Sequence, residues 1–317
     1  MSSDRGKYAD LIDQETWEFI ERTNDWYPPD TANYPIDRQR AIYDAMSREF
    51  FTGYPEGVRA EMIEIDCEAH SIPARHYSCE SANQSAVVVY YHGGGFVVGG
   101  LESHDDVCAE ICQRTGYELI SVDYRLAPEH RFPAAFDDAV FSFLWAAKTF
   151  GKPVVLCGDS AGGNLSATVS HAARQKTHQP IGQVLIYPGL GGDMSKGSYV
   201  EHSHAPMLTT DDIALYSAAY SSRTSSGEDP RSYPLKDDDF SGLPPTVLIA
   251  AECDPLCSDC PDYDAKLKQA GINSHCVIET GLVHGYLRAR STVKRAGDSF
   301  DRIVDAVSHL GKGEWPY

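Results

Sequence analysis

The sequence predicts an α/β fold in which a mostly parallel sheet of eight strands is covered by helices on both faces. Short apolar runs of strand length alternate along the chain with segments of helical periodicity. The 317 residues are enough to bury one large core. Apolar residues make up 42% and charged residues 23%, as is usual for a globular protein.

Residues 1–52 are predicted to form a helical segment that precedes a sheet domain of residues 53–317. Two stretches in it, 15–21 and 38–48, have helical periodicity and are separated by three prolines. Such a helix pair cannot bury its apolar faces alone, so it must dock on the rest of the chain. Both a plain packing layer and a lid over a cleft are consistent with this pattern.

The sheet is expected to begin with two antiparallel strands between 58 and 79, because apolar residues alternate on either side of a turn near 68–71. The later runs are apolar without alternation, which is typical of buried parallel strands. These six runs lie at 86–91, 119–123, 154–156, 184–187, 246–251 and 276–278. Helices are expected between and after them, at 105–115, 133–149, 161–175, 260–270 and 288–310.

The interval 190–240 breaks this alternation, because it separates two strands by far more than a crossover needs. It is rich in Gly, Ser, Asp and Tyr and holds one helical piece near 210–221. An insertion of that size at the carboxyl edge of the sheet would complete a helical cap over a site.

A nucleophile elbow is predicted at Gly158-Asp159-Ser160-Ala161-Gly162, between the strand at 154–156 and the helix that follows. The turn is so tight that only glycine fits on either side of the serine. Ser160 would stand exposed at the start of a helix, where unpaired backbone N–H groups favour negative charge. An ordinary N-cap serine in a glycine-rich turn is the alternative.

An oxyanion hole is predicted from His92-Gly-Gly-Gly-Phe96, directly after the strand at 86–91. Three consecutive glycines let the backbone bend so that its N–H groups aim at one point. We assign the donors to the N–H groups of Gly93, Gly94 and Ala161, and we take His92 as structural. A phosphate-binding loop would need a lysine at a spacing that this sequence lacks.

A serine nucleophile needs a base, and the base needs an orienting carboxylate, in the chain order Ser, acid, His for this kind of elbow. Asp254 follows the strand at 246–251 and would lie at the carboxyl edge of the sheet. The rival acids are Glu252 and Asp259.

His284 is the predicted base, since it lies in a loop between the last strand and the last helix, 30 residues after Asp254. The rival histidines are badly placed, with His275 at the start of a strand and His309 in the terminal helix.

The formal net charge of −19 argues against nucleic acid or an anionic membrane as a partner, and it disfavours acidic partners generally. No stretch reaches membrane-spanning length and the N-terminus has no signal-like apolar core, so we expect a cytoplasmic protein. Nine cysteines without an export signal favour reduced thiols. The cluster Cys253, Cys257 and Cys260 lacks a fourth ligand at metal spacing, so we expect no metal.

Taken together, five motifs resemble those of the bacterial hormone-sensitive-lipase-like (family IV) esterases of the α/β-hydrolase superfamily, in the subgroup with Asp before the serine. They are His92-Gly-Gly-Gly-Phe96, Asp123-Tyr-Arg-Leu-Ala-Pro-Glu-His130, Gly158-Asp-Ser-Ala-Gly-Gly163, Asp254-Pro-Leu256 and His284-Gly285. The resemblance runs from about residue 60 to the end, and within the family it is nearest to acetyl esterases. The sequence departs from the family after Leu256, where Cys257-Ser-Asp-Cys260 replaces the usual Arg and acidic residues.

The resemblance implies a carboxylesterase that hydrolyses short-chain acyl esters of small molecules without a cofactor. It also implies a cap built from the N-terminal helices and the 190–240 insertion, and a homodimer, since members often pair edge strands or last helices. Two alternatives stay open: an amidase, lactonase or arylformamidase with the same triad, and a binding module on a catalytically inactive hydrolase fold.

Overall fold

The computed structural model describes residues 5–28, 31, 34–67, 70–80, 85–221 and 228–317. Eight strands form one sheet in the order β1-β2-β4-β3-β5-β6-β7-β8. Their bounds are β1 Val58–Asp66, β2 Ser71–Cys79, β3 Val87–Tyr91, β4 Glu118–Val122, β5 Val154–Asp159, β6 Gly182–Ile186, β7 Thr246–Cys253 and β8 Ser274–Val283.

The sheet is antiparallel only at its first edge, where β2 pairs antiparallel with both β1 and β4. Every other neighbouring pair is parallel. The predicted class, the eight strands and the antiparallel start are therefore confirmed. Positions 68–69 of the predicted turn lie outside the described residues.

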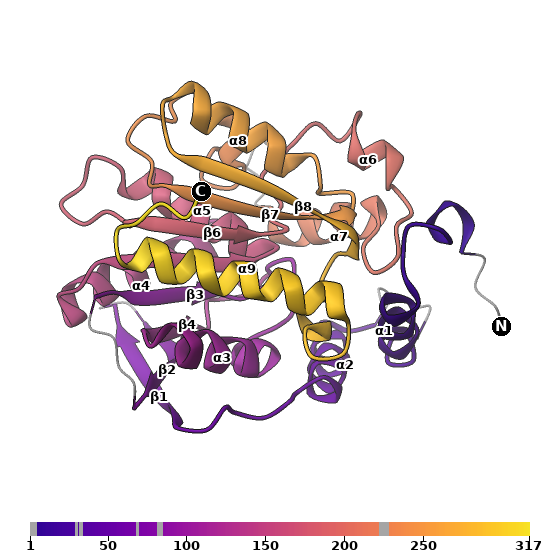
Figure 1. Ribbon diagram of the computed structural model, residues 1–317, viewed down its shortest axis with the longest axis horizontal. Helices are drawn as coiled ribbons and strands as arrows, with labels where there is room; N and C mark the ends of the chain where they lie inside the picture. Colours follow the sequence, from indigo (N-terminus) through magenta and orange to yellow (C-terminus); the bar gives the residue numbers. More distant parts are fainter. Residues whose placement is uncertain (1–4, 29–30, 32–33, 68–69, 81–84, 222–227) are drawn as a thin grey trace.

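Helices cover both faces of the sheet. On one face α3 packs against α9, which crosses the middle of the view in Figure 1, and on the other α4 packs against α5. The bounds are α3 Asp105–Thr115, α4 Ala134–Phe150, α5 Ala161–Ala173, α8 Asp259–Gln269 and α9 Lys294–Gly311. Strands β3, β5 and β6 lie between these layers and are buried along their whole length, as their unbroken apolar runs predict.

The last helix was predicted to begin at 288, and this is wrong by six residues. The short 3-10 helix η5 (Tyr286–Ala289) comes first, and α9 begins only at Lys294, after an extended Val293. A 3-10 turn followed by an extended residue interrupts the helical hydrogen bonds, although the apolar periodicity continues through it. Strand β8 is also longer than predicted and runs on to Val283.

The N-terminal helices and the insertion meet at one end of the sheet, at the right of Figure 1. They are η1 (Gly6–Tyr8), α1 (Gln14–Asn24) and α2 (Ile36–Glu49) from the N-terminus, then α6 (Ser198–Glu201), α7 (Thr210–Tyr220) and η4 (Pro234–Lys236) from the insertion. Tyr8 of the first group contacts Nδ1 of His202 in the second through its hydroxyl, at 3.1 Å. Both groups lie at the carboxyl ends of the parallel strands, where open α/β sheets carry their sites.

Arg40 attaches α2 to the sheet domain. Its guanidinium donates to the backbone oxygens of Val97 at 2.9 Å and Ala127 at 3.0 Å, and it pairs with Glu129 at 2.7 Å. The sequence gives no signal for this contact, because the three partners come from two different loops of the sheet domain.

No helix within the described ranges combines the length and the apolar character that crossing a bilayer requires.

We predict that Arg40→Ala lowers the free energy of unfolding by about 1 to 2 kcal/mol, because charged hydrogen bonds are lost at a partly exposed site. The variant should also be cut faster by protease within α2. Urea denaturation and limited proteolysis check both effects. Arg59→Ala removes an exposed arginine of β1 and is the control, expected to stay within about 0.5 kcal/mol of wild type. Equal effects of the two substitutions would show that Arg40 does not hold α2.

Candidate active site

Ser160 stands on a strained turn between β5 and α5. Its φ of 53° and ψ of −118° lie in a region that side-chain-bearing residues rarely adopt. The turn is held because the Ser160 N–H donates to the Ile186 oxygen at 2.8 Å. A Cβ on Gly162 would overlap the backbone oxygen of Tyr91, so glycine is required where α5 passes the end of β3. This is the geometry that the elbow motif predicts.

The structure brings the predicted serine, histidine and aspartate together. Nε2 of His284 lies 2.9 Å from Oγ of Ser160, and Nδ1 of His284 lies 2.7 Å from Oδ2 of Asp254. Asp254 is fully buried, and its other oxygen accepts the N–H of Leu256 at 2.9 Å. Each oxygen of the carboxylate therefore has a hydrogen-bond partner, which holds the carboxylate in place. The carboxylate in turn fixes the imidazole so that Nε2 faces the serine.

The two rival acids bind other backbone groups. Glu252 accepts the N–H of Gly281 at 2.7 Å, which steadies the end of β8. Asp259, at the start of α8, accepts the N–H of Leu190 at 2.6 Å and that of Gly191 at 3.1 Å. No hydrogen bond joins either carboxylate to His284.

The two rival histidines also have other contacts. The His275 ring stacks on Tyr317 with ring centres 3.8 Å apart. His309 contacts the backbone oxygen of Asp305 through Nδ1, at 2.8 Å. Neither histidine lines the cavity that contains Ser160.

The glycine loop after β3 lines the same cavity as Ser160, and one of the oxyanion donors predicted in this loop is wrong. The N–H of Gly93 donates to Oδ1 of Asp159 at 2.9 Å, so it is not available to an oxyanion. The N–H groups of Gly94, Gly95 and Ala161 have no acceptor among the described residues, and all three residues line the cavity.

Asp159 is a buried carboxylate that connects three parts of the site. Besides the Gly93 N–H, Oδ1 accepts the hydroxyl of Tyr90 at 2.8 Å, and Nε2 of His104 lies 3.2 Å from Oδ2. Burial opposes ionisation of Asp159, but His104 and Tyr90 outweigh it and hold the pKa of this carboxyl well below its usual range. Asp159 therefore stays charged and fixes the glycine loop to the elbow. The motif contains Asp159, but nothing in the sequence marks His104 as its partner.

His92 braces the same loop, as expected. Nδ1 lies 2.8 Å from the oxygen of Gly93, and the ring stacks on Tyr124 with centres 4.3 Å apart. Burial lowers the pKa of His92 to about 4, so the ring is neutral near pH 7. Tyr124 in turn donates to the His92 backbone oxygen at 2.7 Å.

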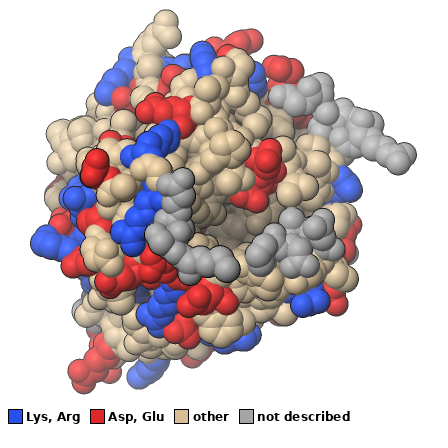
Figure 2. All heavy atoms as spheres, turned by 90° about the vertical axis from the view of Figure 1, so that its right-hand side faces the viewer, with Lys and Arg blue, Asp and Glu red and all other residues tan. Residues whose placement is uncertain are grey.

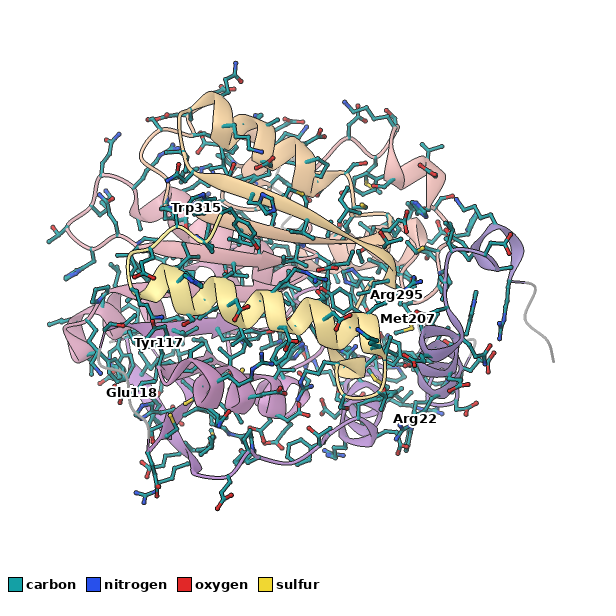
Figure 3. All side chains as sticks on the ribbon, viewed as in Figure 1. Arg22, Tyr117, Glu118, Met207, Arg295 and Trp315 are labelled. Carbon is teal, nitrogen blue, oxygen red and sulfur yellow. The ribbon has the colours of Figure 1, made fainter. Side chains whose placement is uncertain are left out.

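A cavity of about 640 Å³ lies over Ser160. Its walls come from the elbow, the glycine loop, the N-terminal helices and the insertion, and include Tyr27, Tyr43, Met46, Gly94, Phe96, Tyr187, Met207, Leu208, Tyr216, Leu256 and Arg288. Figure 2, which views the molecule from the right-hand side of Figure 1, shows a hollow near the middle of that face. Met207, labelled in Figure 3, comes from the loop before α7. The wall residues that come from the N-terminal helices and the insertion could not be identified from sequence, because no motif marks them.

The three cysteines of the 253–260 segment are free thiols. Burial raises the pKa of Cys253 and of Cys257 to about 12 each, so these thiols are protonated near neutral pH. In the part of the chain that the structure describes, no group of three or more His, Cys, Asp and Glu side chains could hold a metal ion.

Comparison with known proteins agrees with this geometry. Residues 88–288 match the family described as alpha/beta hydrolase fold. The chain is 32% identical over 255 residues to an ethyl acetate hydrolase of Pseudomonas putida, covering 77% of this chain and 80% of that protein. It is 36% identical over 288 residues to the carboxylic ester hydrolase LipN of Mycobacterium tuberculosis, covering 86% and 75% of the two chains. The structure of an esterase from Pyrobaculum calidifontis superposes with a TM-score of 0.84 at 32% identity, covering 94% and 98%.

We predict that Asp159→Ala lowers kcat/KM by about 10- to 100-fold, because a hydrogen bond to a charged group is lost and the Gly93 N–H is left buried without an acceptor. Asp159→Asn keeps an oxygen for that N–H and should lose less. Ester hydrolysis by both variants, with circular dichroism as a folding control, tests this. Equal losses in the two variants would mean that the contact with Gly93 does not position the loop.

The buried Asp259 is expected to make the stability of the protein depend on pH. Burial raises its pKa to about 7, against the pull of its backbone N–H donors and Tyr199. An unfolded aspartate has a pKa of about 3.9, so the unfolded chain loses this proton first. The stability that protonated Asp259 contributes is complete below about pH 4 and is lost as the pH rises through about 7.

The free energy of unfolding of wild type, relative to Asp259→Asn, should therefore fall by about 2 to 4 kcal/mol between pH 4 and pH 8. Denaturant titrations across this range measure the difference. Asp262→Asn, at an exposed position of the same helix, is the control and should show no such change. A constant difference for Asp259→Asn would contradict the raised pKa.

Proposed function

The chain belongs to the α/β-hydrolase family and is a carboxylic ester hydrolase, and from that premise we propose that it is a serine esterase that hydrolyses short-chain acyl esters through Ser160. The observation that carries the proposal is the pair of contacts from His284, one to Ser160 at 2.9 Å and one to Asp254 at 2.7 Å. A serine, a histidine and a buried carboxylate in this arrangement can activate the hydroxyl as a nucleophile.

In the proposed reaction, Nε2 of His284 takes the proton from Ser160 as Oγ attacks the ester carbonyl. The tetrahedral intermediate collapses when His284 returns this proton to the leaving alcohol, which gives the acyl-enzyme. Water then attacks the acyl group, His284 takes the proton from this water, and the carboxylic acid leaves as the proton returns to Ser160. Asp254 holds the Nδ1–H tautomer and stabilises the imidazolium.

We assign the oxyanion hole to the N–H groups of Gly94, Gly95 and Ala161. Their freedom from other acceptors among the described residues supports this, as does their position in the cavity wall. Gly94 has a φ of 127°, and a Cβ there would overlap the Val98 oxygen, so the loop can reach this conformation only with glycine.

We also propose that residues 1–52 and the 190–240 insertion act together as a cap. Tyr27 and Tyr43 from the N-terminal part and Met207 and Tyr216 from the insertion all line the cavity. These side chains would exclude water from the acyl group and limit its length. The preference for short acyl chains is consistent with the name of the Pseudomonas relative, an ethyl acetate hydrolase. A cytoplasmic location and a homodimer stay predictions from the sequence.

We expect p-nitrophenyl acetate and butyrate to be hydrolysed at least about 10-fold faster, in kcat/KM, than the decanoate, because a long chain must displace the cap. Ser160→Ala should lose about 10⁴-fold or more in kcat with every ester, since the nucleophile is gone. Thermal unfolding of the variant is the folding control. Retained activity in Ser160→Ala would overturn the serine mechanism, and a preference for decanoate would overturn the short-chain proposal.

A further inference from the structure

A cation lies in the cavity beside the catalytic histidine. Arg288 is in η5, four residues after His284, and it lines the same cavity as Ser160. Most of the other wall residues are apolar, aromatic or glycine. A guanidinium in such a wall needs an explanation, because desolvating a charge is costly.

The hydrogen bonding of Arg288 is incomplete. Nη2 donates to the hydroxyl of Tyr43, and the guanidinium carbon lies 4.8 Å from the centre of that ring. Nε is buried and has no hydrogen-bond partner, and no carboxylate in the described part of the chain pairs with this arginine. Arg290, two residues later, is fully paired by contrast, with Asp106 and Glu110 at 2.8 Å each.

The acidic groups near Arg288 already have partners. Asp159 accepts from Gly93 and Tyr90 and contacts His104, as described above. Asp212, the other carboxylate among the described wall residues, accepts the N–H of Thr209 at 2.9 Å and its hydroxyl at 2.7 Å, at the start of α7. The tyrosines around the guanidinium are neutral, because burial raises the pKa of Tyr27 and Tyr43. The charge of Asp159 attracts the guanidinium, but no hydrogen bond joins the two. Arg288 therefore places a positive charge in the cavity wall, and its Nη1 has no hydrogen-bond partner among the described residues.

We propose that Arg288 binds a carboxylate on the substrate, so that the preferred substrates are esters that also carry a free carboxylate. This rests on the proposed function and narrows its substrate class. A planar guanidinium matches a carboxylate with paired hydrogen bonds, and these are strong where water is excluded. The tyrosines of the wall would pack against the apolar part of the same molecule.

The net charge of −19 does not forbid this, although it led us to disfavour acidic partners. Surface charges are screened over about 8 Å at physiological salt, whereas a partly buried charge is screened much less. The local charge in the cavity therefore dominates the binding of a small anion, and the surface charge mainly slows its approach.

The test compares esters that differ by one carboxylate. Monoethyl succinate against ethyl butyrate places the carboxylate on the acyl side, and 4-acetoxybenzoate against phenyl acetate places it on the alcohol side. Each pair is measured with wild type and with Arg288→Met. Arg295→Met is the matched control: Arg295, labelled in Figure 3, pairs with Asp13 at 2.9 Å and does not line the cavity.

We expect Arg288→Met to lose about 10- to 100-fold in kcat/KM, mainly through KM, for the anionic member of at least one pair. The neutral esters should change less than about threefold, and Arg295→Met should leave both members of each pair unchanged. The pair that responds shows which side of the ester Arg288 binds. Equal losses for anionic and neutral esters in both pairs would overturn the inference and leave Arg288 as a support for Tyr43.

The wild type alone also tests the inference if Arg288→Met does not fold. Wild type should then have a KM for the anionic ester of one pair that is at least about 10-fold lower than its KM for the neutral ester of that pair. The absence of such a preference in both pairs would contradict the inference. Failure of the proposed function would look different. In that case wild type and Ser160→Ala would hydrolyse ethyl butyrate at the same rate.

Discussion

The close passage of the first turn of α5 over the end of β3 is the constraint on which the rest of the site depends. It is possible only because Gly162 has no side chain to meet the Tyr91 oxygen. Because α5 begins so close to β3, Ser160 adopts its strained conformation at the N-terminus of this helix. Strain of this kind persists only where neighbouring contacts hold it, here the hydrogen bond from Ser160 to Ile186 and the packing of α5 on the sheet.

The charges of the molecule are arranged in two different ways. Over the whole sequence acidic residues outnumber basic ones by 46 to 27, whereas inside the site the buried carboxylates of Asp159 and Asp254 each have defined hydrogen-bond donors. Asp254 orients an imidazole, and Asp159 holds a loop. Arg288 is the exception, because no carboxylate among the described wall residues hydrogen-bonds to it, although the charge of Asp159 attracts it through space. A largely apolar cavity wall that carries a cation binds neutral acyl groups and can add selectivity through an ionic contact.

Local patterns in the sequence were enough to predict the fold, the elbow and the order of the triad residues. Turn glycines and apolar runs reflect the local backbone conformation and burial of the segments in which they occur. They misassigned Gly93, because its N–H is bound by a carboxylate 66 residues away. They placed the start of the last helix too early, because periodicity does not reveal a 3-10 turn. They could not reveal the contacts of Arg40 and Arg288, since these form only when α2 packs against loops that lie far away in the sequence.

The most direct test of the central claim is to find where the acyl group is attached during turnover. The reaction with p-nitrophenyl acetate would be quenched in acid, and the digested protein would be analysed by mass spectrometry. Our account predicts one acetyl group on the peptide that contains Ser160, and none on the same peptide of a Ser160→Ala variant. Acetylation of another residue that turns over at the catalytic rate, or rapid turnover without any acylated protein, would contradict it.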